Sequence, residues 1–153
     1  MSNKEYAFWV HGVNTIVERP EHTQVIRHTG LGTIIEQDED PPGRNNWFHL
    51  PIPTPTLLEG ESAFVGKFTL KVWMNENVRL TDVHVRVGDY KIADETPNLV
   101  GQDQDAKVNF NISHGEWFQM KGGLSLCARF EFLSGSPRGR IVTRGAGARF
   151  KKD

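Results

Sequence analysis

Prolines recur at every second residue after an aromatic pair in residues 45–56, which read Asn-Asn-Trp-Phe-His-Leu-Pro-Ile-Pro-Thr-Pro-Thr. Proline has no backbone N–H, and in an extended chain the N–H groups of residues two apart point the same way. Pro51, Pro53 and Pro55 therefore remove hydrogen-bond donors from one side of the segment only. The spacing predicts an edge strand, or a strip laid along a sheet, that is closed to further strand addition.

Apolar and polar side chains alternate along most of the chain, which is the period of a half-buried β-strand. In residues 64–74 the apolar face holds Phe68, Leu70, Val72 and Met74, and the other face holds Lys67, Thr69, Lys71 and Trp73. Shorter runs predict strands at residues 6–10, 13–17, 24–28, 33–36, 83–87, 90–92, 107–112, 124–132, 141–143 and 148–150. Turn residues separate these runs. The pattern predicts an all-β fold, an antiparallel β-sandwich of jelly-roll type, with a β-barrel as the alternative.

The length and composition of the chain limit the number of domains and the classes of partner. A chain of 153 residues that is 37% hydrophobic, with nine Phe and four Trp, can bury the core of one domain without disulfides or metals. We expect a single domain over residues 1–153, with frayed ends at residues 1–5 and 151–153. The formal net charge of −1 argues against a nucleic-acid or anionic-membrane partner.

Signals for targeting and redox chemistry are sparse. No stretch approaches the ~20 apolar residues of a membrane helix, and the N-terminus lacks an apolar run of signal-peptide length. A cytoplasmic location is the default expectation, although export without a cleaved signal would leave no trace. The single cysteine, Cys127, excludes an intramolecular disulfide, and its apolar neighbours favour a small strand residue over a reactive thiol.

Four sequence blocks carry a resemblance to a known family. They are Trp-Val-His-Gly at residues 9–12, Gly-Leu-Gly-Thr at 30–33, Trp-Phe-His-Leu-Pro-Ile-Pro-Thr-Pro at 47–55 and Val-His-Val at 83–85. Together they resemble a family of small uncharacterised bacterial proteins, across most of residues 9–132. The resemblance implies a single β-sandwich domain and brings no assigned catalytic residues. The arginine- and glycine-rich residues 138–149 are not part of it.

Metal sites receive little support from residue spacing. His11, His49 and His84 lie in or beside predicted strands and could converge, but no two histidines have ligand spacing on one element. Isolated histidines at the rim of a core are the simpler interpretation. Asp38, Asp40, Asp103 and Asp105 are weak calcium candidates, which fit solvated turns better. No cofactor is predicted, with calcium as the one candidate.

No catalytic constellation stands out. The chain contains no Gly-x-Ser-x-Gly elbow, and nothing in the sequence brings a pair of carboxylates together. The C-terminal segment of residues 139–150 combines glycines, which allow close backbone approach, with arginines, which bind carboxylates or phosphates. It could form a subunit contact or an anion site, but a terminal strand with a glycine bulge is favoured.

Binding is the function that the residues favour. Tryptophan offers a flat apolar plate with a donor at its edge, a combination that suits sugars, although burial is favoured for any single tryptophan. The predicted ligand-binding residues are Trp73, Lys71, His84, Arg86, Trp117 and His49. The deciding question is whether the tryptophans and histidines of this set share one concave surface.

We therefore expect a noncatalytic, lectin-like binding or interaction module for carbohydrate or another polar small ligand, with possible homo-oligomerisation. One alternative is a structural or assembly protein that forms homo-oligomers through its sheet edges and the arginine- and glycine-rich segment. Another is a small enzyme with a pocket between the sheets, in which a histidine acts as acid or base. Fold alone does not choose among them.

Overall fold

The computed structural model describes residues 4–39 and 44–153, and strands make up most of them. The elements are β1 (Tyr6–His11), η1 (Gly12–Asn14), β2 (Ile16–Val17), η2 (Pro20–His22), β3 (Val25–Thr29), β4 (Gly32–Gln37), β5 (Asn45–Ile52), β6 (Leu57–Leu58), β7 (Glu61–Met74), β8 (Val78–Val87), β9 (Tyr90–Glu95), β10 (Leu99–Val100), β11 (Gln104–Asn111), β12 (Phe118–Gln119), β13 (Leu124–Phe132) and β14 (Gly139–Lys152). Among these residues, no helix is long and apolar enough to cross a membrane.

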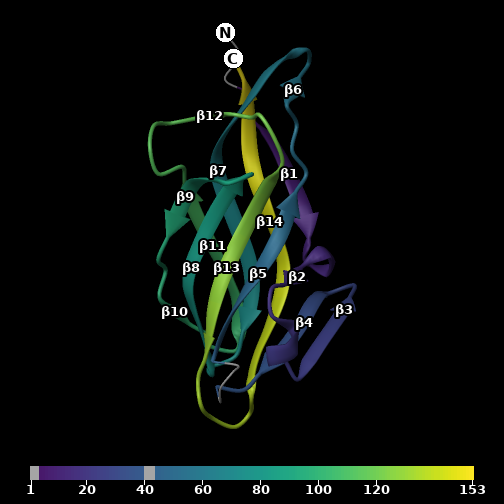
Figure 1. Ribbon diagram of the computed structural model, residues 1–153, viewed down its shortest axis with the longest axis vertical. Helices are drawn as coiled ribbons and strands as arrows, with labels where there is room; N and C mark the ends of the chain where they lie inside the picture. The colour runs from purple at the N-terminus through teal and green to yellow at the C-terminus, as the bar shows by residue number, and fades with distance from the viewer. Residues whose placement is uncertain (1–3, 40–43) are drawn as a thin grey trace.

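Two antiparallel sheets pack face to face (Figure 1). Sheet A has the order β11-β7-β14-β4-β3, with β1 also beside β14 and with β6 and β12 beside β7. Sheet B has the order β10-β8-β13-β5-β2, with β9 also beside β8. The predicted jelly-roll-like β-sandwich is confirmed, and the two sheets of the described residues do not close into the alternative barrel.

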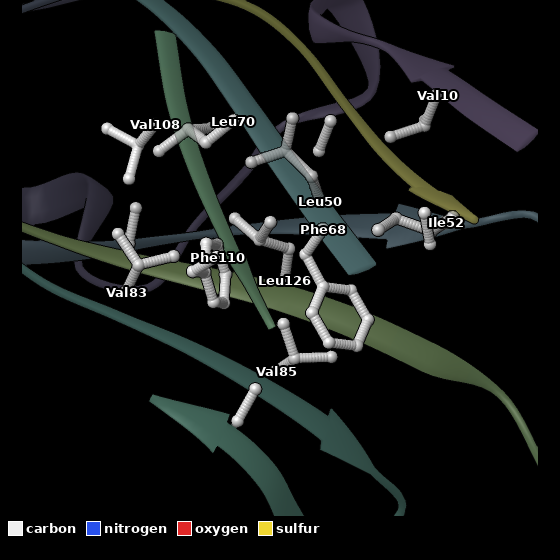
Figure 2. Packing of buried hydrophobic residues seen from close by; sticks show 14 of the residues in the cluster. Val10, Leu50, Ile52, Phe68, Leu70, Val83, Val85, Val108, Phe110 and Leu126 are labelled. Atoms are coloured by element: carbon white, nitrogen blue, oxygen red, sulfur yellow. The ribbon is translucent and has the colours of Figure 1, made fainter. Parts of the chain in front are cut away.

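The period-two pattern fixes which face of each strand is buried. Phe68 and Leu70 of β7 meet Val85 of β8 and Leu126 of β13 between the sheets (Figure 2). Aromatic rings add to this core, because Phe48 and Phe130 lie 5.4 Å apart at their centroids. Full burial of each such side chain stabilises the fold by about 2 kcal/mol. Apolar side chains thus fill the space in which the enzyme alternative needed a pocket.

The proline segment is one-sided, as its spacing predicts, but it is not the outermost strand. β5 pairs with β13 along its length, and the two residues of β2 cover Phe48 and His49 on the other side. The carbonyl of Trp47 points to the β2 side, where it accepts from Glu18, so the side without a donor at Pro51 is this same outer side. The strand ends at Ile52, before the other two prolines.

Three local expectations are corrected. Residues 13–17 are not one strand, because η1 occupies Gly12–Asn14 and only two residues of β2 follow. The predicted strands at 141–143 and 148–150 are one strand, β14, with a bulge at Arg144 between Thr143 and Gly145. The tail expected to fray belongs to β14 through Lys152, whose ammonium lies 2.9 Å from the Glu59 carboxylate.

The arginine- and glycine-rich segment lies inside sheet A rather than at an edge. β14 is held by β7 on one side, and by β4 and then β1 on the other. Its arginines lie within ion-pair distance of the chain's own carboxylates: Arg138 with Asp38, Arg140 with Glu36, Arg144 with Asp105 and Arg149 with Glu5. Because this segment is paired on both sides, it offers no free sheet edge for assembly.

Candidate functional site

The six residues predicted to bind a ligand lie on opposite outer faces of the sandwich. Those on sheet A are Lys71 and Trp73 in β7 and Trp117 before β12. Those on sheet B are His49 in β5 and His84 and Arg86 in β8. The predicted tryptophans and histidines therefore do not share one concave surface.

Three cross-strand rows build a groove on the outer face of sheet A. The middle row runs through β1, β14, β7 and β11 and consists of Trp9, Gly147, Thr69 and Asn109. The rows on either side of it are Ala7, Arg149, Lys67 and Asn111, and His11, Gly145, Lys71 and Lys107. Because residues in register on adjacent strands point to the same face, the side chains of each row stand together.

The groove consists of three adjoining hollows of about 280, 280 and 340 Å³. The first two share Lys67 and Asn111, and the first and third share Lys107. From Gly66 to Lys71 it runs about 17 Å along β7, at ~3.4 Å per residue. We call it the aromatic–lysine groove and define it by Trp9, Trp117, Lys67, Thr69, Lys71, Lys107 and Asn109.

Trp9 forms the first aromatic surface of this groove. Its ring lies against Gly147, where an added Cβ would come within 2.5 Å of Cδ2 and Cε3, so only glycine leaves room for the ring. The residue remains 45% exposed. The Lys71 ammonium lies 4.7 Å from the ring centroid. The result is a flat apolar plate held in place beside a cation.

Trp117 repeats this arrangement at one end of the groove. Its ring lies against Gly66 of β7, where a Cβ would come within 2.8 Å of Cδ2 and Cε3. Two ammonium groups lie near the ring centroid, Lys151 at 4.9 Å and Lys67 at 5.9 Å. The middle and one end of the groove thus each combine an aromatic ring, a glycine and a lysine.

The groove has an excess of positive charge. Lys67 pairs with Glu5 at 2.7 Å and Arg144 with Asp105 at 3.0 Å, which neutralises part of it. Among the described residues, no carboxylate lies within 4.0 Å of the Lys71, Lys107 or Lys151 ammonium. This excess on a chain of net charge −1 means that the charge is segregated to one face.

A separate hollow, of about 370 Å³, lies on the outer face of sheet B. The register places His84, Cys127 and His49 side by side on β8, β13 and β5. We call it the histidine–cysteine pocket and define it by Glu18, Trp47, His49, His84, Arg86, Ser125 and Cys127. It contains three of the six predicted residues.

The two histidines of this pocket have opposite electrostatic surroundings. The neighbouring Cys127 is the largest cause that raises the pKa of His49, and the Glu18 carboxylate, 3.3 Å from Nε2, adds to it. Burial lowers the pKa of His84, and the charge of Lys91 acts in the same direction. The ring of His84 packs against Trp47 with centroids 5.0 Å apart. The environments therefore push the two pKa values apart.

The described part of the chain contains no cluster of three or more His, Cys, Asp or Glu residues placed to hold a metal ion. Arg138 engages Asp38 at 2.9 Å, and Arg144 engages Asp105 at 3.0 Å. Asp103 lies beside Glu76, whose pKa it raises. Asp40 lies outside the described residues. Arginines thus hold two of these carboxylates, and calcium binding at the described candidates stays a prediction.

Sequence reasoning missed residues at both places. Trp9 was not among the predicted binding residues, because burial was favoured for any single tryptophan, but alternation from the buried Val10 places it on the outer face. Trp47 and Cys127 are outward residues of β5 and β13, and Glu18 comes from the segment after β2. The predicted Trp73 is half-buried, in register with Asp105 on one side and Val142 on the other. It does not line the groove, whereas its neighbours Lys71 and Asp105 do.

Distant relatives of the fold occur among solved structures. The xylan-binding module CBM15 aligns with a TM-score of 0.58 and 14% identity over 98% of this chain and 99% of that chain. The Stig cyclase Fisc from Fischerella sp. TAU gives 0.52 and 10% over 92% and 88%. TmCBM61 in complex with beta-1,4-galactotriose gives 0.51 and 10% over 95% and 88%. At these identities the likeness shows the fold alone.

Comparison of the sequence with known families identifies the family of this chain. No curated protein matches the chain. A family model matches residues 3–141, which include all four sequence blocks on which the resemblance rests. The resemblance to a family without an assigned function is thus confirmed, and the chain belongs to the family of unknown function DUF6623.

Proposed function

We propose that this protein is a noncatalytic binding module that takes a saccharide in the aromatic–lysine groove. The observation that carries the proposal is the pair of tryptophans, Trp9 and Trp117, each lying against a strand glycine in one groove. Sugar rings have an apolar face that packs on an aromatic plate, while their hydroxyls need donors and acceptors nearby. The groove supplies both kinds of contact.

Polar groups line the groove between the two rings. The Thr69 hydroxyl donates to the Asn109 side-chain oxygen at 2.7 Å, which leaves the Asn109 amide N–H groups for a ligand. Asn111 and Lys107 stand on the same face of β11. An exposed aromatic plate with fixed polar groups is an orienting surface rather than a catalytic one.

The length and charge of the groove indicate which class of saccharide it suits. A groove of about 17 Å along β7 suits an oligosaccharide better than a single sugar ring. Lys71, Lys107 and Lys151 favour a saccharide that carries carboxylate or sulfate groups, because each adds a favourable charge interaction at a partly exposed site. The xylan-binding and galactotriose-bound modules share the fold and supply an analogy only.

A glycan array followed by calorimetric titration tests the proposal. Immobilised neutral and acidic oligosaccharides would be screened together, and tryptophan fluorescence would report contact with the rings. We expect binding to at least one acidic oligosaccharide that weakens as salt is added. The absence of a response to every saccharide class would contradict the proposal.

A further inference from the structure

The histidine–cysteine pocket holds the only thiol of the chain between two imidazoles. Cys127 lies in register with His49 on one side and His84 on the other, and all three side chains point away from the core. Cys127 is 6% exposed, and it lines this hollow. The saccharide proposal does not involve this face.

The arrangement follows the order nucleophile, base and orienting group. Cys127 faces His49 in register on the neighbouring strand, and His49 Nε2 lies 3.3 Å from Glu18 Oε1. A carboxylate at one ring nitrogen fixes the orientation of an imidazole. The Ser125 hydroxyl adds a weak contact to Cys127 Sγ at 3.7 Å.

The charges around the two histidines support this geometry. On the His49 side the nearest charge is Glu18, which favours an imidazolium next to the sulfur. On the His84 side, Lys91 and Arg86 favour the neutral ring, while Asp82 and Asp94 oppose them. Lys91 and Asp94 pair at 2.8 Å, so these two charges largely offset each other. A thiol between two imidazoles, one with a raised and one with a lowered pKa, has a proton acceptor and a favourable charge within reach.

We propose that Cys127 is a thiol–disulfide exchange site that accepts a small anionic disulfide in the histidine–cysteine pocket. A hollow of about 370 Å³ has the size of a small-molecule site. The exposed guanidinium of Arg86 at its rim attracts a carboxylate of the reagent.

The exchange balances without any further reactant. An imidazole takes the thiol proton, and Sγ of Cys127 attacks one sulfur of the incoming disulfide. The reagent's S–S bond breaks as a mixed disulfide forms on the protein. The departing thiolate takes up the proton, so the products are the mixed disulfide and one free small thiol.

The rate of thiol release from two disulfide reagents tests the site on the folded full chain. Dithiobis(nitrobenzoate) is the anionic reagent and dithiodipyridine the neutral one, and absorbance reports the thiol released at neutral pH. We expect one thiol per chain without denaturant and none from Cys127→Ser. His49→Gln should slow both reactions about tenfold, because the sulfur loses its adjacent imidazole. Release only after unfolding, or equal rates in wild type and His49→Gln, would overturn the proposal.

Arg86→Gln separates the anionic preference from general reactivity. It should slow the anionic reagent about fivefold and leave the neutral reagent unchanged, since only the charge attraction is removed. An equal effect on both reagents, or no effect on the anionic one, would refute the preference. Circular dichroism would verify that each variant is folded. If His49→Gln does not fold, Glu18→Gln at an exposed position carries the test, with an expected slowing of about threefold, and an unchanged rate would overturn the site.

Discussion

The outer faces of the two sheets use the same strand geometry for different chemistry. On sheet A, glycines opposite Trp9 and Trp117 leave the rings flat against the backbone, and lysines surround them. On sheet B the corresponding outward row holds a thiol between two imidazoles, with one tryptophan packed on His84. The comparison shows that a tryptophan ring can lie flat on a sheet only where the residue beneath it is small, as Gly147 and Gly66 are.

The two faces also differ in charge. The groove on sheet A has lysines without carboxylate partners among the described residues, whereas the pocket on sheet B has charges of both signs, Glu18 and Arg86, at its rim. A long cationic groove suits an extended acidic ligand, and a small mixed-charge hollow suits a compact one.

Replacement of a tryptophan on either face gives the largest contrast. Trp9→Ala should weaken saccharide binding about thirtyfold, or ~2 kcal/mol, because the ring supplies the main apolar contact. Trp47→Ala removes the same side chain from sheet B and should leave binding unchanged. Isothermal titration of both variants measures this, and equal losses would erase the functional distinction between the faces.

The glycine under Trp9 offers a smaller change that keeps the ring. Gly147→Ala should weaken saccharide binding about tenfold and lower the free energy of unfolding by about 1–3 kcal/mol, because the new methyl group collides with the ring. Gly123→Ala is the matched control, since a Cβ there meets nothing within 4 Å. Calorimetry and denaturant unfolding measure both effects. Wild-type affinity in Gly147→Ala would mean that the position of the ring is irrelevant.

Charge in the groove should matter less than stacking. Lys71→Gln should weaken binding of an acidic oligosaccharide about threefold and reduce its salt dependence, while a neutral oligosaccharide loses nothing. Lys121→Gln, at an exposed position outside the groove, controls for overall charge. Titrations at low and high salt distinguish the two variants. Identical behaviour would assign the salt effect to net charge alone.

The smallest expected effect is the pH dependence of stability on sheet B. The pKa of His49 is raised above 6.5 in the folded state, so its contribution is present below pH 6.5 and is lost as the pH rises through the raised value. The pKa of His84 is lowered, so its contribution is lost as the pH falls from 6.5 toward the lowered value. Urea unfolding across this range should show that His49→Gln removes the upper slope and His84→Gln the lower one. Slopes of the opposite sign would contradict the assignment.

The fold was predictable because burial obeys a period of two. The alternation in residues 64–74 predicts both faces of β7, and the neighbouring runs at 83–87 and 90–92 predict the two strands that pair as β8 and β9. The η1 turn was missed because Val13 belongs to a short β-branched run, while the choice between strand and turn depends on tertiary contacts. Gly12 packs there so closely that a Cβ would come within 1.7 Å of the Thr143 carbonyl oxygen.

The candidate sites were harder to predict because they depend on register between distant strands. The sequence identified four residues that line the two sites, Lys71, Trp117, His49 and His84. Sequence spacing does not reveal that His84 and His49 both neighbour Cys127. Trp9 was absent from the predicted binding residues for a related reason. Its exposure follows from alternation, but its role depends on pairing with Gly147, which lies far along the chain.

Whether saccharide binds at the aromatic–lysine groove is tested most directly by the indole N–H resonances of the four tryptophans. Single replacements assign the signals, and an acidic oligosaccharide is titrated into the labelled protein. We expect the Trp9 and Trp117 signals to shift together with one dissociation constant, while the Trp47 signal on the opposite face stays in place. A shift of Trp47 alone, or no shift of any indole signal at saturating saccharide, would contradict binding in the groove.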